Sequence, residues 1–238
     1  MVLVFFFISG TALAALTEFS GIDAGVSSGP NSLAARNSFI SASGSLLPVI
    51  DFETLAVGTL RTDPFKPVAV SPGVSVNYFG DIDSSISLQG VSNNFSLALG
   101  FNTTSGGSNY LGFIPTFNPQ NTPGMTWTFT NPIYGWGVYI SGLEPGVDGV
   151  LHVLFNDGAS HDLIIPDGSD DGGIQFYGFL SDQPFSLFNF EELGVSDVRD
   201  IFGVDDVLVA VPEPATMFLL GSGLIGLAGY GRKKFFKK

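Results

Sequence analysis

Residues 125–142 read MTWTFTNPIYGWGVYISG, and this stretch decides the fold class. Over residues 125–130 large apolar side chains alternate with threonine, so Met125, Trp127 and Phe129 face one way and the threonines face the other. Alternation with a period of two residues is typical of a β-strand with one buried face. Residues 133–142 are the next candidate strand along the chain. The stretch therefore predicts two strands of a β-protein.

The rest of the chain continues this pattern of short strands separated by turn clusters. Its 31 glycines and 14 prolines disfavour helix interiors. The further candidate strands are 49–55, 74–79, 86–90, 95–101, 110–114, 150–156, 160–165, 174–180, 185–191 and 204–211. Many short strands at regular spacing predict an all-β domain, a two-sheet antiparallel sandwich of the jelly-roll kind.

One short helix precedes the strands. Residues 32–43 (SLAARNSFISAS) carry apolar side chains at helical spacing, Asn31 or Ser32 is placed to cap the start, and Gly44 is placed to end the helix. We therefore expect a single β-sandwich domain with a leading helix over residues 31–211.

Composition and charge exclude several classes of function. The chain has 238 residues and no cysteine, which excludes disulfides, thiolate metal sites and cysteine nucleophiles. Residues 15–214 contain 22 acidic residues and only four basic ones, Arg36, Arg61, Lys66 and Arg199. So acidic a surface repels phosphates, and we expect no nucleic acid partner.

The N-terminus has the pattern of a secretory signal peptide. Residues 1–14 hold an apolar run, VLVFFFI, and end in the small-residue site Ala12-Leu13-Ala14, although no basic residue precedes the run. This pattern predicts the Sec translocon and signal peptidase as partners, followed by a Ser/Gly linker over residues 15–30. The alternative is a buried N-terminal strand.

The C-terminus has the pattern of a membrane anchor. Residues 215–231 carry no charge, and as a helix they span about 26 Å, near the lower limit for crossing a bilayer. Pro212, Glu213 and Pro214 precede this run, and a basic tail, 232–238, follows it. Because basic residues stay on the cytoplasmic side, we expect a transmembrane helix with the acidic body outside.

The C-terminal segment resembles the PEP-CTERM sorting signal of Gram-negative bacteria in the order of its parts. This segment reads VPEPATMFLLGSGLIGLAGYGRKK. The resemblance assigns the motif to Pro212, Glu213 and Pro214, the membrane helix to residues 215–231, and the basic stop to Arg232, Lys233 and Lys234. It implies recognition by an exosortase, a membrane-embedded peptidase that removes the tail. The alternative is an ordinary single-span anchor after a Pro-rich stalk.

The body between the signals also resembles the bodies of other proteins with this sorting signal. The residues that carry the likeness include VIDFETLAVGT at 49–59, FTNPIYGWGVYI at 129–140 and FGVDDVLVAV at 202–211. The resemblance implies a jelly-roll-like sandwich similar in outline to carbohydrate-binding modules, and it carries no activity with it.

Catalytic patterns are weak in this sequence. Gly25-Val26-Ser27-Ser28-Gly29 matches a hydrolase nucleophile motif in letters, but it lies in the expected linker. His152 is expected on a strand face in a packed or edge position, and His161 with Asp162 as a surface pair. The adjacent pairs Asp170-Asp171, Glu191-Glu192 and Asp205-Asp206 make poor catalytic dyads, because neighbours on a strand point to opposite faces.

Two binding functions remain open. Asp167, Asp170 and Asp171 lie in a Gly-rich loop whose oxygens suit Ca²⁺, and the alternative is a solvated acidic turn. Trp127, Trp136, Tyr134 and Tyr139 are able to stack on sugars, and the alternative is core packing. No other cofactor is expected.

These observations favour an exported, non-enzymatic protein of the cell surface or of an extracellular polysaccharide matrix. We expect an inner-membrane intermediate with the body in the periplasm, followed by exosortase cleavage. The alternatives are a secreted carbohydrate-active hydrolase and a permanently anchored sugar-binding or calcium-binding module.

Overall fold

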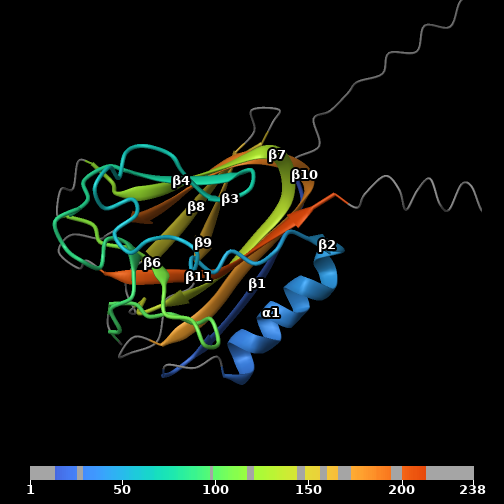
Figure 1. Cartoon of the computed structure of the whole chain (residues 1–238). Helices are drawn as coiled ribbons and strands as arrows, with labels where there is room; N and C mark the ends of the chain where they lie inside the picture. Colours follow the sequence, from blue (N-terminus) through green and yellow to red (C-terminus); the bar gives the residue numbers. More distant parts are fainter. Residues whose placement is uncertain are drawn as a thin grey trace, which may run out of the picture.

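The computed structural model describes residues 14–25, 29–96, 99–116, 121–143, 148–155, 160–165, 173–193 and 200–212. These ranges hold one helix and eleven strands, all paired antiparallel (Figure 1). In chain order they are β1 (Leu16–Asp23), α1 (Pro30–Ser43), β2 (Ser45–Leu46), β3 (Val68–Ser71), β4 (Val74–Phe79), β5 (Gly90–Ser92), β6 (Tyr110–Phe113), β7 (Gly124–Ser141), β8 (Asp148–Phe155), β9 (Ser160–Ile165), β10 (Ile174–Leu193) and β11 (Phe202–Val211).

Two long strands, β7 and β10, belong to both layers of the sandwich. In one layer, the first half of β7 pairs with β4 on one side and with the second half of β10 on the other. That half of β10 pairs in turn with β8, and β8 pairs with β9. In the other layer, the second half of β7 pairs with β11 on one side and with the first half of β10 on the other. That half of β10 pairs in turn with β1. The register of β10 against β7 shifts between Leu180 and Phe185 and again between Phe185 and Leu187, and these shifts mark the change of layer. The predicted antiparallel sandwich is thus confirmed.

The core lies between the layers and is largely aromatic. Trp127 and Trp136, from the two halves of β7, meet with ring centroids 5.6 Å apart, and Phe188 lies 4.9 Å from Trp136. Met125, Trp127 and Phe129 all face this core, as the alternation predicted. The sugar-stacking role considered for Trp127 and Trp136 is therefore wrong, because both side chains are fully buried.

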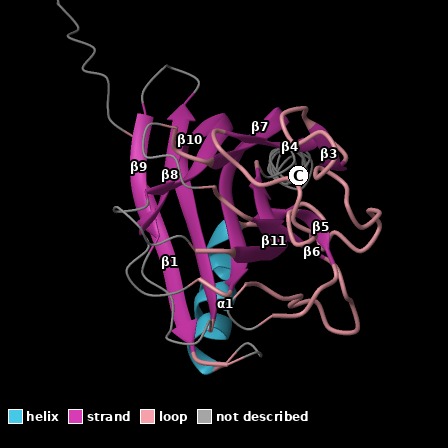
Figure 2. Cartoon of the chain, turned by 90° about the vertical axis from the view of Figure 1, so that its left-hand side faces the viewer, coloured by secondary structure: helices cyan, strands magenta, loops and turns pink. Residues whose placement is uncertain are grey.

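Helix α1 covers the outer face of the layer that contains β1 (Figures 1 and 2). It forms a second, smaller core in which Phe39 contacts Phe19 and Phe176, and Tyr139 contacts Phe176 from the sheet. Tyr139 is thus buried as well, so it is not part of an open stacking face. Among the described residues, no helix is long and apolar enough to cross a bilayer; residues 215–231 lie outside them.

The helix begins earlier than predicted and is capped by a different residue. Its N-cap is Gly29, which has no side chain to cap it, and Pro30 occupies the first turn. Asp23 at the end of β1 supplies the cap: its Oδ1 accepts from the Asn31 N–H at 3.1 Å and its Oδ2 from the Ser32 N–H at 2.7 Å. Gly44 ends the helix at φ 69°, as predicted.

The prediction of a linker over residues 15–30 is wrong for most of this range. Residues 16–23 form β1, which pairs residue by residue with β10 from Leu16↔Ser181 to Asp23↔Ile174. The backbone pairing to β10 holds this segment in place despite its turn-forming residues. The domain therefore begins before residue 31, and the predicted signal peptide, residues 1–14, lies outside the described residues except for Ala14.

Three predicted strands are also corrected. Residues 49–55 make only the isolated bridge Ile50↔Val207, because Phe52 adopts a left-handed φ of 58° and the chain turns there. Residues 86–89 form turns, and in 95–101 the described residues contribute only the bridge Ser96↔Gly100. In contrast, two predicted strands, 125–130 and 133–142, are joined in the single strand β7. Two others, 174–180 and 185–191, are joined in the single strand β10.

Candidate functional site

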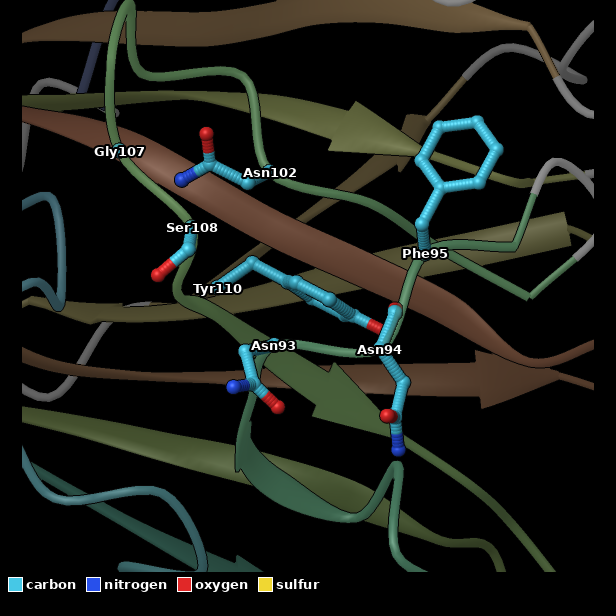
Figure 3. A pocket seen from close by; sticks show the side chains of 7 residues that line it. All are labelled: Asn93, Asn94, Phe95, Asn102, Gly107, Ser108 and Tyr110. Atoms are coloured by element: carbon cyan, nitrogen blue, oxygen red, sulfur yellow. The ribbon is translucent and has the colours of Figure 1, made fainter.

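A pocket of about 290 Å³ opens between the loop after β5 and the loop before β6 (Figure 3). Seven residues line it: Asn93, Asn94, Phe95, Asn102, Gly107, Ser108 and Tyr110. Figure 3 shows the Tyr110 ring at its centre, between Asn93 and Asn94 on one side and Asn102 and Ser108 on the other. The Tyr110 hydroxyl donates to the Asn94 carbonyl at 2.7 Å. The pocket thus presents amides and hydroxyls around aromatic rings.

Phe95 contributes an exposed aromatic ring to this lining. It packs against the buried Phe101 with ring centroids 5.7 Å apart, yet 67% of its surface is exposed. None of the seven lining residues carries a carboxyl, imidazole or amino group, and burial raises the pKa of Tyr110. The lining therefore offers neutral polar groups and aromatic rings.

Glu53 holds the loop that forms one wall of the pocket. Its Oε1 accepts from the Ser108 N–H at 2.7 Å, from the Asn109 N–H at 2.8 Å and from Asn102 Nδ2 at 2.9 Å. The left-handed turn at Phe52 places Glu53 opposite this loop. Sequence reasoning missed Glu53, because residues 49–55 read as a strand. The polar run NTTSGGSN at 102–109 was the available sign of a long loop.

Asp205 and Asp206 also hold this loop. Asp205 Oδ2 accepts from the backbone N–H groups of Thr103 at 2.7 Å and Thr104 at 3.2 Å. Asp206 Oδ2 accepts from the Thr103 hydroxyl at 3.1 Å, and its Oδ1 from the Thr104 hydroxyl at 2.7 Å. The two carboxylates therefore converge on one pair of threonines.

This convergence corrects the expectation that Asp205 and Asp206 point to opposite faces. The β11 register against β7 shifts between Asp205 and Leu208, and Asp206 adopts a left-handed φ of 49°. A bulge of this kind re-aims side chains that regular pleating would separate. A non-glycine residue in that region is strained and is often found at functional sites.

Asp205 is the most perturbed acid among the described residues. Burial raises its pKa to about 7, the neighbouring Asp206 carboxylate adds to the rise, and the N–H of Thr103 opposes it. The side chain is fully buried, and its Oδ1 has no hydrogen-bond partner. The residue therefore combines a positioning role in the loop with one unsatisfied oxygen.

The predicted histidine sites lie elsewhere. His152 is half-buried on the outer face of β8, where Nδ1 contacts Asp162 Oδ1 and Nε2 lies 3.3 Å from Glu191 Oε2. Asp162 thus pairs with His152 across the β8–β9 ladder. Within the part of the chain that the structure describes, no group of three or more His, Asp or Glu residues is arranged to hold a metal ion.

Most of the predicted sorting and calcium residues fall outside the described ranges. Those residues are Glu213, Pro214, Arg232, Lys233 and Lys234 for sorting and Asp167, Asp170 and Asp171 for calcium. Pro212 is described: it is exposed and follows the last residue of β11 directly. The β11 end is fixed by pairing with β2, as Ala210↔Leu46 and Val211↔Ser45.

The sequence of residues 210–233 matches the model of the PEP-CTERM protein-sorting motif. The match confirms the predicted signal, which implies an exported protein handled by an exosortase. No curated protein matches the sequence.

Three solved structures are weakly similar to part of this chain. The CBM22-1 xylan-binding domain of Paenibacillus barcinonensis Xyn10C is 14% identical with a TM-score of 0.38, covering 71% of this chain and 97% of that one. The enzymatically active domain of tailspike protein 4 of bacteriophage CBA120 is 13% identical with a TM-score of 0.36, covering 68% and 22%. The CBM22-1–GH10 modules of Clostridium thermocellum xylanase 10B, complexed with xylohexaose, are 9% identical with a TM-score of 0.36, covering 71% and 29%.

Proposed function

Because residues 210–233 carry a PEP-CTERM sorting signal, we propose that the chain is an exported, non-enzymatic protein whose folded body an exosortase frees from its anchor. The supporting observation is the junction at Pro212: β11 ends at Val211, and the next residue is exposed. A proline fixes its own φ and donates no backbone hydrogen bond, so the two prolines of the motif disfavour a helix, which suits a peptidase. Cleavage after Pro212 removes no strand of the sandwich.

The steps of this sorting follow from the two ends of the chain. The Sec translocon and signal peptidase act on residues 1–14, and residues 215–231 then hold the body at the periplasmic side of the inner membrane. Arg232, Lys233 and Lys234 keep the tail cytoplasmic. After cleavage the body reaches the cell surface or the extracellular polysaccharide matrix.

The mass of the protein from membrane and medium fractions tests this sorting. We expect chains in the medium to lack the basic tail, and a Glu213→Gln variant to accumulate in the membrane with Lys238 still present. Asp63→Asn, a change at an exposed acid far from the signal, is the matched control. Wild-type chains that all end in Lys238 would instead identify a permanent anchor.

The pocket supports a second proposal: it binds a neutral carbohydrate. Amides and hydroxyls pair with sugar hydroxyls, and an exposed ring such as Phe95 packs on the apolar face of a sugar. The absence of carboxyl and imidazole groups from the seven lining residues favours binding over the hydrolase alternative.

Affinity electrophoresis of the full-length chain in gels containing neutral polysaccharides tests this second proposal. We expect retardation by at least one polysaccharide and its loss in Phe95→Ala. Phe65→Ala is the matched control, because Phe65 is 60% exposed but lies outside the pocket lining. Equal retardation of both variants contradicts the pocket's role, and released reducing ends would identify a hydrolase.

A further inference from the structure

The first strand begins and the last strand ends at the same end of one layer. Thr17 of β1 pairs with Leu180 of β10, and Leu180 pairs with Gly135 of β7. Gly135 also pairs with Ala210 of β11, so these four residues form one row across the layer. Three strand spacings separate Thr17 from Ala210, which is about 14 Å. One residue beyond this row β1 begins and β11 ends, so both ends of the chain leave the sheet there.

Neither end of the chain has much slack outside the sheet. The Ala15 N–H donates to Asp182 Oδ1 at 2.8 Å, and the Asp182 N–H donates to the Ala15 carbonyl at 3.1 Å, so the chain is held up to the predicted signal-peptidase site. At the other end, four residue steps lead from Val211, the last residue of β11, to Ala215, where the predicted membrane helix begins. Four steps span at most about 14 Å. An anchored body therefore stays close to the bilayer.

The pocket lies at the opposite end of β11. This strand runs from β6, which contributes Tyr110 to the pocket, to β2 (Figure 1). Phe101, which packs against Phe95, exchanges two hydrogen bonds with the hydroxyl of Ser141. Ser141 pairs with Gly203, near the start of β11. From Gly203 to the last residue of β11 is about 25 Å along the strand.

The end where the chain leaves the sheet is nearly neutral. This end, called the terminal end below, consists of residues 15–16, 45–48, 181–184 and 210–212. Asp182 is its only charged residue, although acidic residues far outnumber basic ones in the rest of the body. Anionic lipid headgroups repel acidic residues within a Debye length of about 8 Å. The terminal end is therefore suited to lie beside a lipid surface.

We propose that the terminal end faces the lipid bilayer of the inner membrane while the body is anchored, and that the pocket faces away from it. This inference rests on the proposed sorting function, which places the membrane helix directly after Pro214. The short connection to that helix holds the terminal end at the bilayer, and the length of β11 separates the pocket from it. A polysaccharide can thus reach the pocket before the exosortase frees the body.

Fluorescence quenching in lipid vesicles tests this orientation. The chain has no cysteine, so Gln183→Cys at the terminal end and Ser105→Cys in the pocket loop each provide one site for a thiol-reactive fluorophore. Both positions are exposed. The full-length chain is reconstituted in phosphatidylethanolamine and phosphatidylglycerol vesicles that carry a quencher at the headgroup. We expect a loss of fluorescence at residue 183 and none at residue 105.

The length of the connection provides the control. An insert of about 20 Gly and Ser residues between Pro214 and Ala215 adds about 25 Å on average, so the quenching at residue 183 should fall while the protein stays on the vesicles. Without the insert, equal quenching at the two positions, or stronger quenching at residue 105, overturns the orientation. A chain that does not float with the vesicles instead contradicts the anchor of the proposed function, and the orientation with it.

Discussion

Glu53 accepts a hydrogen bond from the N–H of Asn109 at 2.8 Å, across 56 residues of sequence. The same oxygen binds Ser108 and Asn102, so one carboxylate holds three points of the pocket loop. In the same loop, Asp205 and Asp206 hold Thr103 and Thr104. The shape of the pocket therefore depends on acids that do not line it.

Glu53→Ala should disorder the pocket loop, because it removes the side-chain acceptor of the Ser108 and Asn109 backbone N–H groups and one of the acceptors of the Asn102 amide. Hydrogen bonds to charged groups contribute about 1.5–3 kcal/mol, and we expect a loss of unfolding free energy of about that size. Denaturant unfolding measures it. Glu53→Gln keeps one carbonyl oxygen and should lose less; equal losses in the two variants would contradict the role of Oε1.

Asp23→Ala should destabilise the protein by about 1 kcal/mol, the usual loss for a helix cap. Burial alone would raise the pKa of Asp23, but hydrogen bonds from Ser32, Asn31 and Gly29 outweigh it and lower the pKa below 3.8. A lowered pKa means that the cap contributes above the unfolded-state value and is lost as the pH falls through the folded-state value. Urea unfolding at pH 7 and below pH 3 should show the difference between the wild type and Asp23→Ala shrinking in acid.

Local patterns in the sequence predicted the parts of the fold that local physics determines. The alternation of Met125, Trp127 and Phe129 placed those side chains in the core because strand pleating depends only on neighbouring residues. Gly44 ended the helix for an equally local reason. Strand β1 was missed because its stability comes from pairing with β10, more than 150 residues away, as the bond between Tyr177 and Glu18 illustrates.

The candidate site was harder to predict because backbone exceptions build it. Asp205 and Asp206 were recognised as a pair, but regular pleating put them on opposite faces, and only the left-handed φ of Asp206 brings them together. Glu53 was hidden within an apparent strand by the turn at Phe52. Neither exception is marked by a glycine, the residue that adopts a positive φ most readily.

Phe188→Ala should cost about 4 kcal/mol, because it opens a cavity where the two layers meet. Phe188 is fully buried and contacts Trp127, Trp136, Phe129 and Phe179. Guanidinium unfolding followed by tryptophan fluorescence measures the loss, since both Trp residues adjoin the cavity. Phe95→Ala, which removes an exposed ring, should change stability by less than about 0.5 kcal/mol. Similar losses at the two positions would mean that Phe188 does not join the layers.

Asp205 should make the metal-free protein less stable as the pH rises. Its folded-state pKa of about 7 exceeds the unfolded value, so between about pH 4 and pH 7 the folded state holds a proton that the unfolded state has lost. Over that window its contribution to the unfolding free energy falls with pH, by an amount on the order of a few kcal/mol.

Asp205→Asn stays neutral at every pH, so the difference between wild type and variant isolates this contribution. In EDTA, Asp205→Asn should unfold at nearly the same denaturant concentration as the wild type near pH 4. As the pH rises to 7, its unfolding midpoint should move to progressively higher denaturant concentrations than that of the wild type. Parallel pH profiles would show that Asp205 is ionised in the folded protein throughout this range. The burial of its side chain would then need a different compensating charge.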